Sequence, residues 1–196
     1  MATSTKLSNT RAAFLGILIA VVSLGCCISS AIRSANRKAP ALARTTPLPA
    51  ATIAQGLTRG NPVPLGEVVL ADNGIALAAS RVLRGAEAWQ EIEAMSVING
   101  EPSAGMEYIL VTVEARFTGG PDDTQRVSRS YFRCVGDRGQ IYAGASVIVE
   151  PDLSLELFGG ASAQGRIAFE VPRDEHGLAL IYSGAGTKAR FLALAP

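Results

Sequence analysis

Few side chains in this chain are suited to chemistry. The best candidates are a single histidine, the cysteine of the C-terminal part and two pairs of acids. His176 is the only histidine, and it lies in the run Arg-Asp-Glu-His-Gly that begins at Arg173, which is typical of an exposed turn. A hydrolytic triad requires a base held between a nucleophile and an orienting acid. Nothing in the spacing around His176 holds it in that way, so the sequence predicts no catalytic residues and no enzymatic activity.

Metal ligands are equally sparse. Beyond residue 27 the chain has one histidine and one cysteine, His176 and Cys134, which cannot assemble a zinc site of the usual composition. Four acids in two turn regions are the alternative, as oxygen ligands for Ca²⁺: Asp122, Asp123, Glu150 and Asp152. Their spacing matches no calcium-loop motif and favours solvated turn acids. We therefore expect no metal site and no cofactor.

Cys134 has no cysteine partner in the C-terminal part of the chain, so no disulfide can form within it. A lone cysteine among apolar residues is typical of a buried, unreactive thiol. We therefore expect the folding of this part to be indifferent to reductant.

The charges divide the chain into two parts of opposite sign. Residues 1–64 carry seven bases and no acid, whereas residues 65–196 carry all 17 acids and the other 11 bases, a net charge of −6. An acidic domain with one tryptophan and no basic stripe is a poor nucleic-acid binder. We therefore expect no nucleic-acid partner.

An apolar segment of 21 residues, 12–32, follows a basic n-region at residues 1–11. At about 1.5 Å per residue, a helix of this length crosses a hydrocarbon layer of roughly 30 Å. Three interpretations are open: a retained transmembrane helix, a signal h-region cleaved after Ala31, or a lipoprotein signal lipidated at Cys26. Gly25 precedes Cys26 as a lipobox requires, although Ser23 stands where such boxes usually carry leucine. We expect a membrane anchor at residues 12–32, with a lipoprotein or a secreted protein as the alternatives.

The bases beside this segment bear on its orientation. Two of them, Lys6 and Arg11, precede the segment, and four follow it within residues 33–44. By the positive-inside rule this count places the C-terminal side in the cytoplasm. Residues 33–64 contain five prolines and many alanines without apolar periodicity, which predicts a flexible linker.

From Leu65 onward the apolar residues follow the period of β-strands. Residues 109–117 alternate, with Ile109, Val111 and Val113 on one face. The pattern recurs before Pro172, which cannot donate a hydrogen bond to a ladder. Further strands are expected at residues 66–70, 75–83, 127–135, 140–149, 178–182 and 189–194. Seven or eight short strands without a long helical period predict an all-β fold, an antiparallel β-sandwich.

An ordered series of motifs gives residues 65–196 a resemblance to a known family. The series is Leu65, Gly66 and Glu67; Gly105 before residues 108–113; Phe132 ahead of Asp137, Gly139 and Tyr142; and Gly165 before residues 167–172. It resembles the bacterial telokin-like domain family of unknown function. The resemblance implies an immunoglobulin-like sandwich on the extracytoplasmic side of a membrane, behind an anchor or lipoprotein signal. It implies no reaction, cofactor or agreed ligand.

The segment between the second and third expected strands, residues 85–104, is longer than a hairpin needs and holds the only tryptophan. Trp89, Ile92 and Met95 recur at three-residue intervals, so a short helical turn puts them on one side. Either this turn closes one open end of the sandwich with Trp89 in the core, or Trp89 stays accessible and anchors a protein partner.

Together these patterns predict a membrane-anchored β-sandwich that serves as a non-enzymatic binding or adhesion module. For the side of the membrane we follow the resemblance, which implies an extracytoplasmic domain, against the count of flanking bases. The alternative is a structural or accessory domain of a cell-envelope assembly. An exposed apolar patch favours the first class, whereas a fixed membrane complex favours the second.

Overall fold

The computed structural model describes residues 55–195. The predicted n-region, the hydrophobic segment 12–32 with Cys26 and most of the predicted linker lie outside the described residues. Within residues 55–195, no helix is long and apolar enough to cross a membrane.

The described residues form ten strands, one α-helix and one 3-10 turn. The strands are β1 (Val69–Leu70), β2 (Ile75–Arg84), β3 (Met106–Phe117), β4 (Thr124–Val127), β5 (Phe132–Val135), β6 (Ile141–Tyr142), β7 (Leu155–Phe158), β8 (Ser162–Pro172), β9 (Ala179–Tyr182) and β10 (Arg190–Ala193). The helix is α1 (Ala86–Met95), and the 3-10 turn η1 (Arg129–Tyr131) joins β4 to β5.

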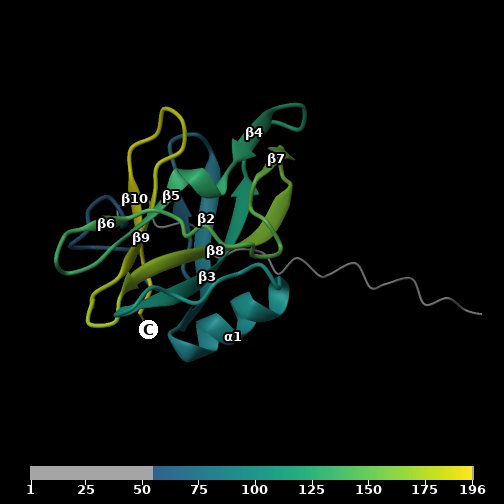
Figure 1. The fold of residues 1–196 in the computed structure, drawn as a ribbon. Helices are drawn as coiled ribbons and strands as arrows, with labels where there is room; N and C mark the ends of the chain where they lie inside the picture. Colours follow the sequence, from purple (N-terminus) through teal and green to yellow (C-terminus); the bar gives the residue numbers. More distant parts are fainter. Residues whose placement is uncertain (1–54, 196) are drawn as a thin grey trace, which may run out of the picture. The chain divides into compact units, whose positions relative to one another are not determined.

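Eight of the strands form two four-stranded antiparallel sheets (Figure 1). The first has the order β1-β2-β3-β8 and the second the order β10-β9-β5-β6, while β4 and β7 pair as a separate two-stranded ribbon. β3 is the long central strand of the first sheet, because it pairs with both β2 and β8.

The main hydrophobic core lies between the two sheets. Ile109 and Phe169 of the first sheet and Phe132 and Leu180 of the second are completely buried in one cluster. Two sheets that share an apolar core in this way form a β-sandwich. The predicted antiparallel β-sandwich is confirmed, with more strands than the seven or eight expected.

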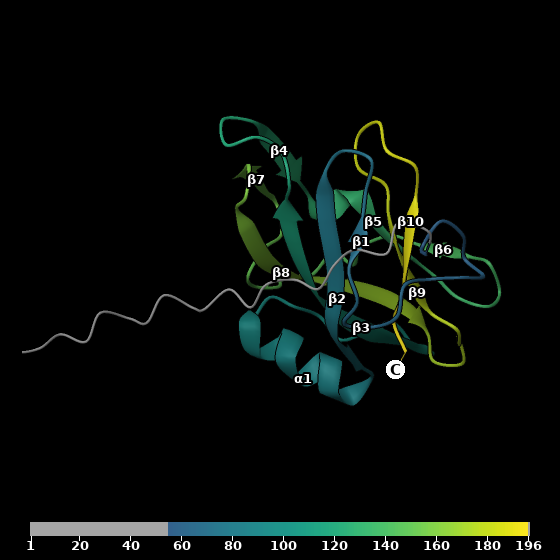
Figure 2. The same cartoon turned by 180° about the vertical axis from the view of Figure 1, so that it is seen from behind.

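α1 covers the outer face of the first sheet, alongside β2 and β3 (Figure 2). Its N-cap is Gly85, whose φ of 62° lies in the left-handed region that glycine enters without strain. Ala88 and Ile92 are completely buried, with Trp89 and Met95 half-buried beside them. The expected helical turn is thus a ten-residue helix, and it covers a sheet face instead of an open end of the sandwich.

The position of α1 explains the mixed character of the outward face of β3. Tyr108 and Leu110 point to this face and are buried in the cluster beneath α1. Further along the strand Glu114 is half-buried and Arg116 is exposed. The outward residues therefore change from apolar to charged where the cover of α1 ends.

Two of the predicted strands are interrupted. The expected strand at residues 127–135 is divided by η1, and of residues 140–149 only Ile141–Tyr142 is a strand. Residues 143–149 instead form a loop beside β8, where the Ala145 N–H donates to the Ala168 carbonyl at 2.8 Å. The strand β7 was not predicted.

The domain begins before Leu65. Val63, which was expected in the linker, is completely buried and forms a parallel bridge with Leu192 of β10. Its N–H donates to the Phe191 carbonyl at 2.9 Å, and its carbonyl accepts from the Ala193 N–H at 2.7 Å. Residues 55–64 therefore belong to the described domain.

The free edge of β8 is covered in a similar way by the chain that follows β6. The Arg166 N–H donates to the Pro151 carbonyl at 2.9 Å, and Asp152 bridges to Arg166. Gly165 permits this approach, because a Cβ there would lie 2.6 to 2.9 Å from atoms of Leu153. Residues 143–152 thus shield most of the strand's outer edge.

Candidate functional site

The three residues predicted as a partner surface hold α1 on the sheet. Ile92 is completely buried, and the ring of Trp89 lies 6.0 Å from the ring of Tyr108 with an interplanar angle of 32°. The Met95 sulfur accepts the Glu150 N–H at 3.3 Å. Trp89, Ile92 and Met95 are thus brought together, and their main contacts are with the domain itself.

Beyond α1, two apolar residues that the sequence did not single out are exposed. Val97 is 99% exposed and Ile98 76% exposed. They lie in a turn in which the Asn99 N–H donates to the Ser96 carbonyl at 3.1 Å. Both are β-branched residues of a kind usually found in cores, so this exposed apolar tip is a candidate protein contact.

A buried acid, Glu175, lies in the segment read as an exposed turn. Its carboxylate is fully enclosed and accepts hydrogen bonds from the Tyr142 hydroxyl at 2.7 Å and the Arg138 N–H at 3.1 Å. These bonds hold the pKa of Glu175 below its ordinary value. Burial and the bond to Glu175 raise the pKa of Tyr142 to about 12. The turn prediction was therefore wrong for Glu175, whereas its neighbour His176 is exposed.

The backbone around Glu175 is fastened by Arg84 at the end of β2. One guanidinium nitrogen of Arg84, Nη2, donates to the carbonyls of Arg173 and Glu175, at 3.0 and 2.7 Å. Its Nε donates to Glu107. Within the described residues no buried side-chain nitrogen or oxygen lacks a hydrogen-bond partner, so the buried part of this cluster serves structure.

Cys134 lies in the sandwich core and pairs with Tyr142 in the β5–β6 ladder. Burial, together with the nearby charge of Glu175, raises the pKa of the Cys134 thiol to about 12. A thiol with that pKa carries almost no thiolate at neutral pH, which makes Cys134 a poor nucleophile.

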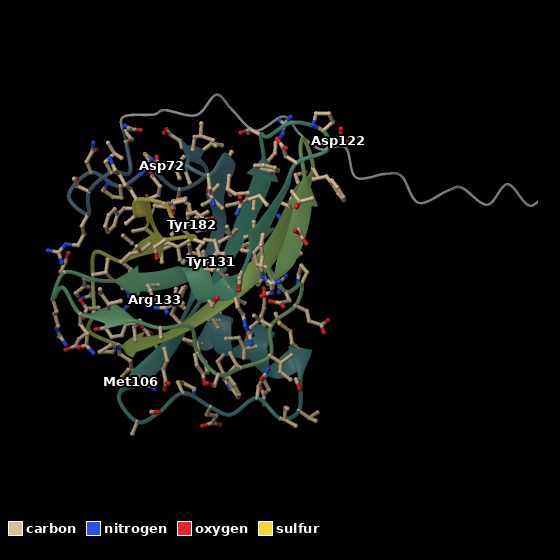
Figure 3. All side chains as sticks on the ribbon, turned by 90° about the horizontal axis from the view of Figure 1, so that it is seen from above. Asp72, Met106, Asp122, Tyr131, Arg133 and Tyr182 are labelled. Atoms are coloured by element: carbon tan, nitrogen blue, oxygen red, sulfur yellow. The ribbon has the colours of Figure 1, made fainter. Side chains whose placement is uncertain are left out.

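The acids considered for calcium do not form a cluster with further ligands. Within residues 55–195, no group of three or more His, Cys, Asp or Glu side chains could hold a metal ion. Asp123 instead accepts the Gly120 N–H at 2.9 Å within its own turn, and Asp122 is exposed near the tip of that turn (Figure 3).

A half-enclosed pocket of about 270 Å³ lies between η1, the loop 143–149 and β8. Its apolar lining includes four buried residues: Val147, Val149, Ile167 and Ala168. Its polar lining is Arg129, Ser130, Arg133 and Ser146, and none of the lining residues is acidic. An apolar floor with a few convergent polar groups is the usual composition of a small-molecule site.

The two arginines of the pocket differ in how they are held. The Arg133 Nη1 donates to the Ser130 and Phe132 carbonyls, both at 2.8 Å, which fixes a half-buried guanidinium beside η1 (Figure 3). Arg129 is exposed. Five other arginines pair with acids within the described residues: Arg81, Arg84, Arg138, Arg166 and Arg190. Arg129 and Arg133 form no such pair in residues 55–195.

One wall of the pocket is clamped by a single side chain. The Asn99 amide accepts the Ile148 N–H at 2.7 Å and donates to the Ile148 carbonyl at 2.9 Å. The same amide donates to the Ile92 carbonyl of α1 at 2.7 Å. The loop 143–149 is therefore fastened to α1, and the pocket is preformed on that side.

Fold and pocket together define an antiparallel β-sandwich protein with a small pocket whose polar side is cationic. No protein-family model matches the chain, and no curated protein matches it either. Several solved structures are similar to part of the chain.

The putative lipoprotein ycdA of Bacillus subtilis is 13% identical with a TM-score of 0.46, over 63% of this chain and 37% of its own. MPT63, a secreted protein from Mycobacterium tuberculosis, is 18% identical with a TM-score of 0.47, over 69% of this chain and 98% of its own. An uncharacterised β-sandwich protein from Clostridium difficile is 12% identical with a TM-score of 0.41, over 69% of this chain and 95% of its own. At such identities and scores the likenesses carry no functional argument.

Proposed function

We propose that the chain is a non-enzymatic binding module, an immunoglobulin-like sandwich of the telokin-like kind held outside the cytoplasm by an anchor at residues 12–32. The observation that carries this proposal is the preformed pocket beside β8, with its apolar floor and two arginines free of acidic partners in the described residues. By contrast, the two buried titratable groups offer no open site: Glu175 is hydrogen-bonded to Tyr142, and the Cys134 thiol is buried with a raised pKa. The uncharged apolar run at residues 12–32 supports the anchor. The location outside the cytoplasm is supported by the family resemblance, against the count of flanking bases.

Topology tests this proposal directly. Asp122 is exposed in a turn, so the Asp122→Cys variant of the full chain adds one exposed thiol to the described domain. We expect a membrane-impermeant maleimide to label this variant in intact cells. The native chain, which carries Cys26, Cys27 and the buried Cys134, is the control, and labelling is measured as the increase above it. Protection of Asp122→Cys until the cells are lysed would place the domain in the cytoplasm and end the proposal.

The exposed tip at Val97 and Ile98 supports the second candidate, an accessory domain of an envelope assembly. A photoreactive residue at position 97 should then crosslink to one defined neighbour in intact cells. The same residue at the exposed position Arg116 is the control. Equal, diffuse crosslinking from both positions would count against an assembly contact at the tip.

A further inference from the structure

We infer that the pocket beside β8 binds a small organic carboxylate with a short apolar body, whose carboxylate lies against Arg133 and Arg129. This inference rests on the proposed binding function and names the class of ligand. It follows from the charge, the geometry and the size of the pocket.

The charge of the pocket is opposite to that of the domain around it. Residues 65–196 hold 17 acids and 11 bases, yet two arginines and no acid line this pocket. An arginine left without an acidic partner retains its donors for a ligand, and a guanidinium matches a carboxylate through two parallel N–H···O bonds. The lining therefore selects an anion over a cation.

The geometry favours Arg133 as the main anchor. Its Nη1 is committed to the Ser130 and Phe132 carbonyls, so the guanidinium is fixed before a ligand arrives. Its Nε and Nη2 form no hydrogen bond within the described residues and remain as donors. Because the side chain is already ordered, binding loses less conformational entropy than it would at a free arginine.

The floor of the pocket adds an apolar requirement. Val147, Val149 and Ile167 are buried and line the pocket, and no acid is among the lining residues. An inorganic anion leaves such a floor in contact with water, whereas a short hydrocarbon body covers it and gains the hydrophobic term. A half-enclosed pocket of about 270 Å³ accommodates a short chain or a single ring.

The test measures binding of radiolabelled hexanoate to the full-length chain. The protein is reconstituted in phosphatidylcholine nanodiscs, binding is followed by equilibrium dialysis, and empty nanodiscs give the partition background. We expect saturable binding above that background. Hexanol and inorganic phosphate, each lacking one half of the ligand chemistry, should compete at least about tenfold more weakly than unlabelled hexanoate.

Variants assign the binding to the arginines. Arg129→Gln and the double variant Arg129→Gln/Arg133→Gln should weaken hexanoate binding, the double variant by at least about tenfold. Arg129→Lys, which keeps the positive charge, should retain part of the hexanoate binding. Arg126→Gln on β4 is the matched control, because Arg126 is exposed and does not line the pocket. Arg129→Gln keeps the test decisive should the double variant not fold, since the side chain of Arg129 makes no hydrogen bond within the described residues.

Three results would overturn the inference. The first is hexanoate binding no greater than to empty nanodiscs. The second is competition by hexanol or by phosphate as strong as that by unlabelled hexanoate. The third is a loss of binding in Arg126→Gln as large as in the variants of Arg129 and Arg133. Each of these excludes this class of ligand and leaves the proposed location outside the cytoplasm standing, because surface labelling of Asp122→Cys tests that location separately.

Discussion

The carboxylate of Glu175 is fully buried yet remains ionised, because the Tyr142 hydroxyl and the Arg138 N–H hold its pKa below the ordinary value of 4.5. A depressed pKa in the folded state stabilises the protein above the ordinary pKa. That stabilisation is lost as the pH falls through the folded pKa. One buried side chain therefore links folding to acidity.

We expect the unfolding free energy of the native domain to decrease as the pH falls below about 4.5, and Glu175→Gln to lose part of this decrease. Some dependence should remain, since the pKa values of Asp72 and Asp174 are also lowered by their hydrogen bonds. Urea unfolding followed by circular dichroism across the acid range measures the effect. Tyr142→Phe removes a hydrogen-bond donor to Glu175, so it should also weaken the dependence of the unfolding free energy on pH. Superimposable profiles of Glu175→Gln and native protein would contradict this account.

Trp89 gives a second prediction at the scale of one residue. Its ring is half-buried against Tyr108, so Trp89→Ala should lower the unfolding free energy by about 2–3 kcal/mol, less than for a fully buried tryptophan. Val97→Ala is the control, because a side chain that is 99% exposed should change stability by less than about 0.5 kcal/mol. If the unfolding free energy of the Trp89→Ala domain were unchanged, Trp89 would instead be a candidate anchor for a protein partner.

Among the elements, α1 and the loop 143–149 form one unit through Asn99. The three hydrogen bonds of its amide join Ile148 to Ile92. Asn99→Ala should therefore lower the unfolding free energy by about 1–3 kcal/mol, because the loop and helix groups lose their partners. Amide hydrogen exchange should also rise at Ile148 more than at Val111 in the sandwich core. Unchanged exchange at Ile148 would show that the loop is held by other contacts.

The strands that the sequence predicted best are those with strict alternation, such as residues 109–117 within β3. The break in the predicted strand at residues 127–135 also has a signal, which a search for apolar residues alone overlooks. The apolar positions change parity between Val127 and Phe132, and η1 accommodates that shift. A parity change within an apolar run is a sign of a turn or bulge.

The pocket was harder to predict. Residues 143–146 read Ala-Gly-Ala-Ser, which has weak strand propensity, and this could have indicated a loop. Nothing in the local sequence brings that loop to Arg129 and Arg133, however, because the pocket depends on pairing with β8. The burial of Glu175 likewise depends on contacts with Tyr142 and Arg138, distant in sequence. Long-range contacts of this kind leave no local pattern.

For the whole molecule, the structure moves the domain boundary toward the N-terminus. A fragment of residues 65–196 lacks Val63, its burial and its two backbone hydrogen bonds to β10. Compared with residues 55–196, it should be less stable by about 2–5 kcal/mol. Chemical denaturation of the two fragments measures this difference. Val63→Ala in the longer fragment, which keeps the backbone bonds, should fall between them, and equal stability of the two fragments would refute the new boundary.

The covered sheet edges bear on how densely copies of the domain could be displayed on the proposed membrane anchor. Molecules tethered to one surface meet at high local concentration, and an open strand would then recruit its neighbour. Here residues 143–152 lie along β8, Val63 lies along β10, and the opposite edges, β1 and β6, are only two residues long. Within residues 55–195, the two four-stranded sheets therefore offer no long run of free backbone donors and acceptors to a second copy. On the proposed anchor, we expect copies to be displayed densely without strand exchange, and any assembly between copies would have to rely on side chains.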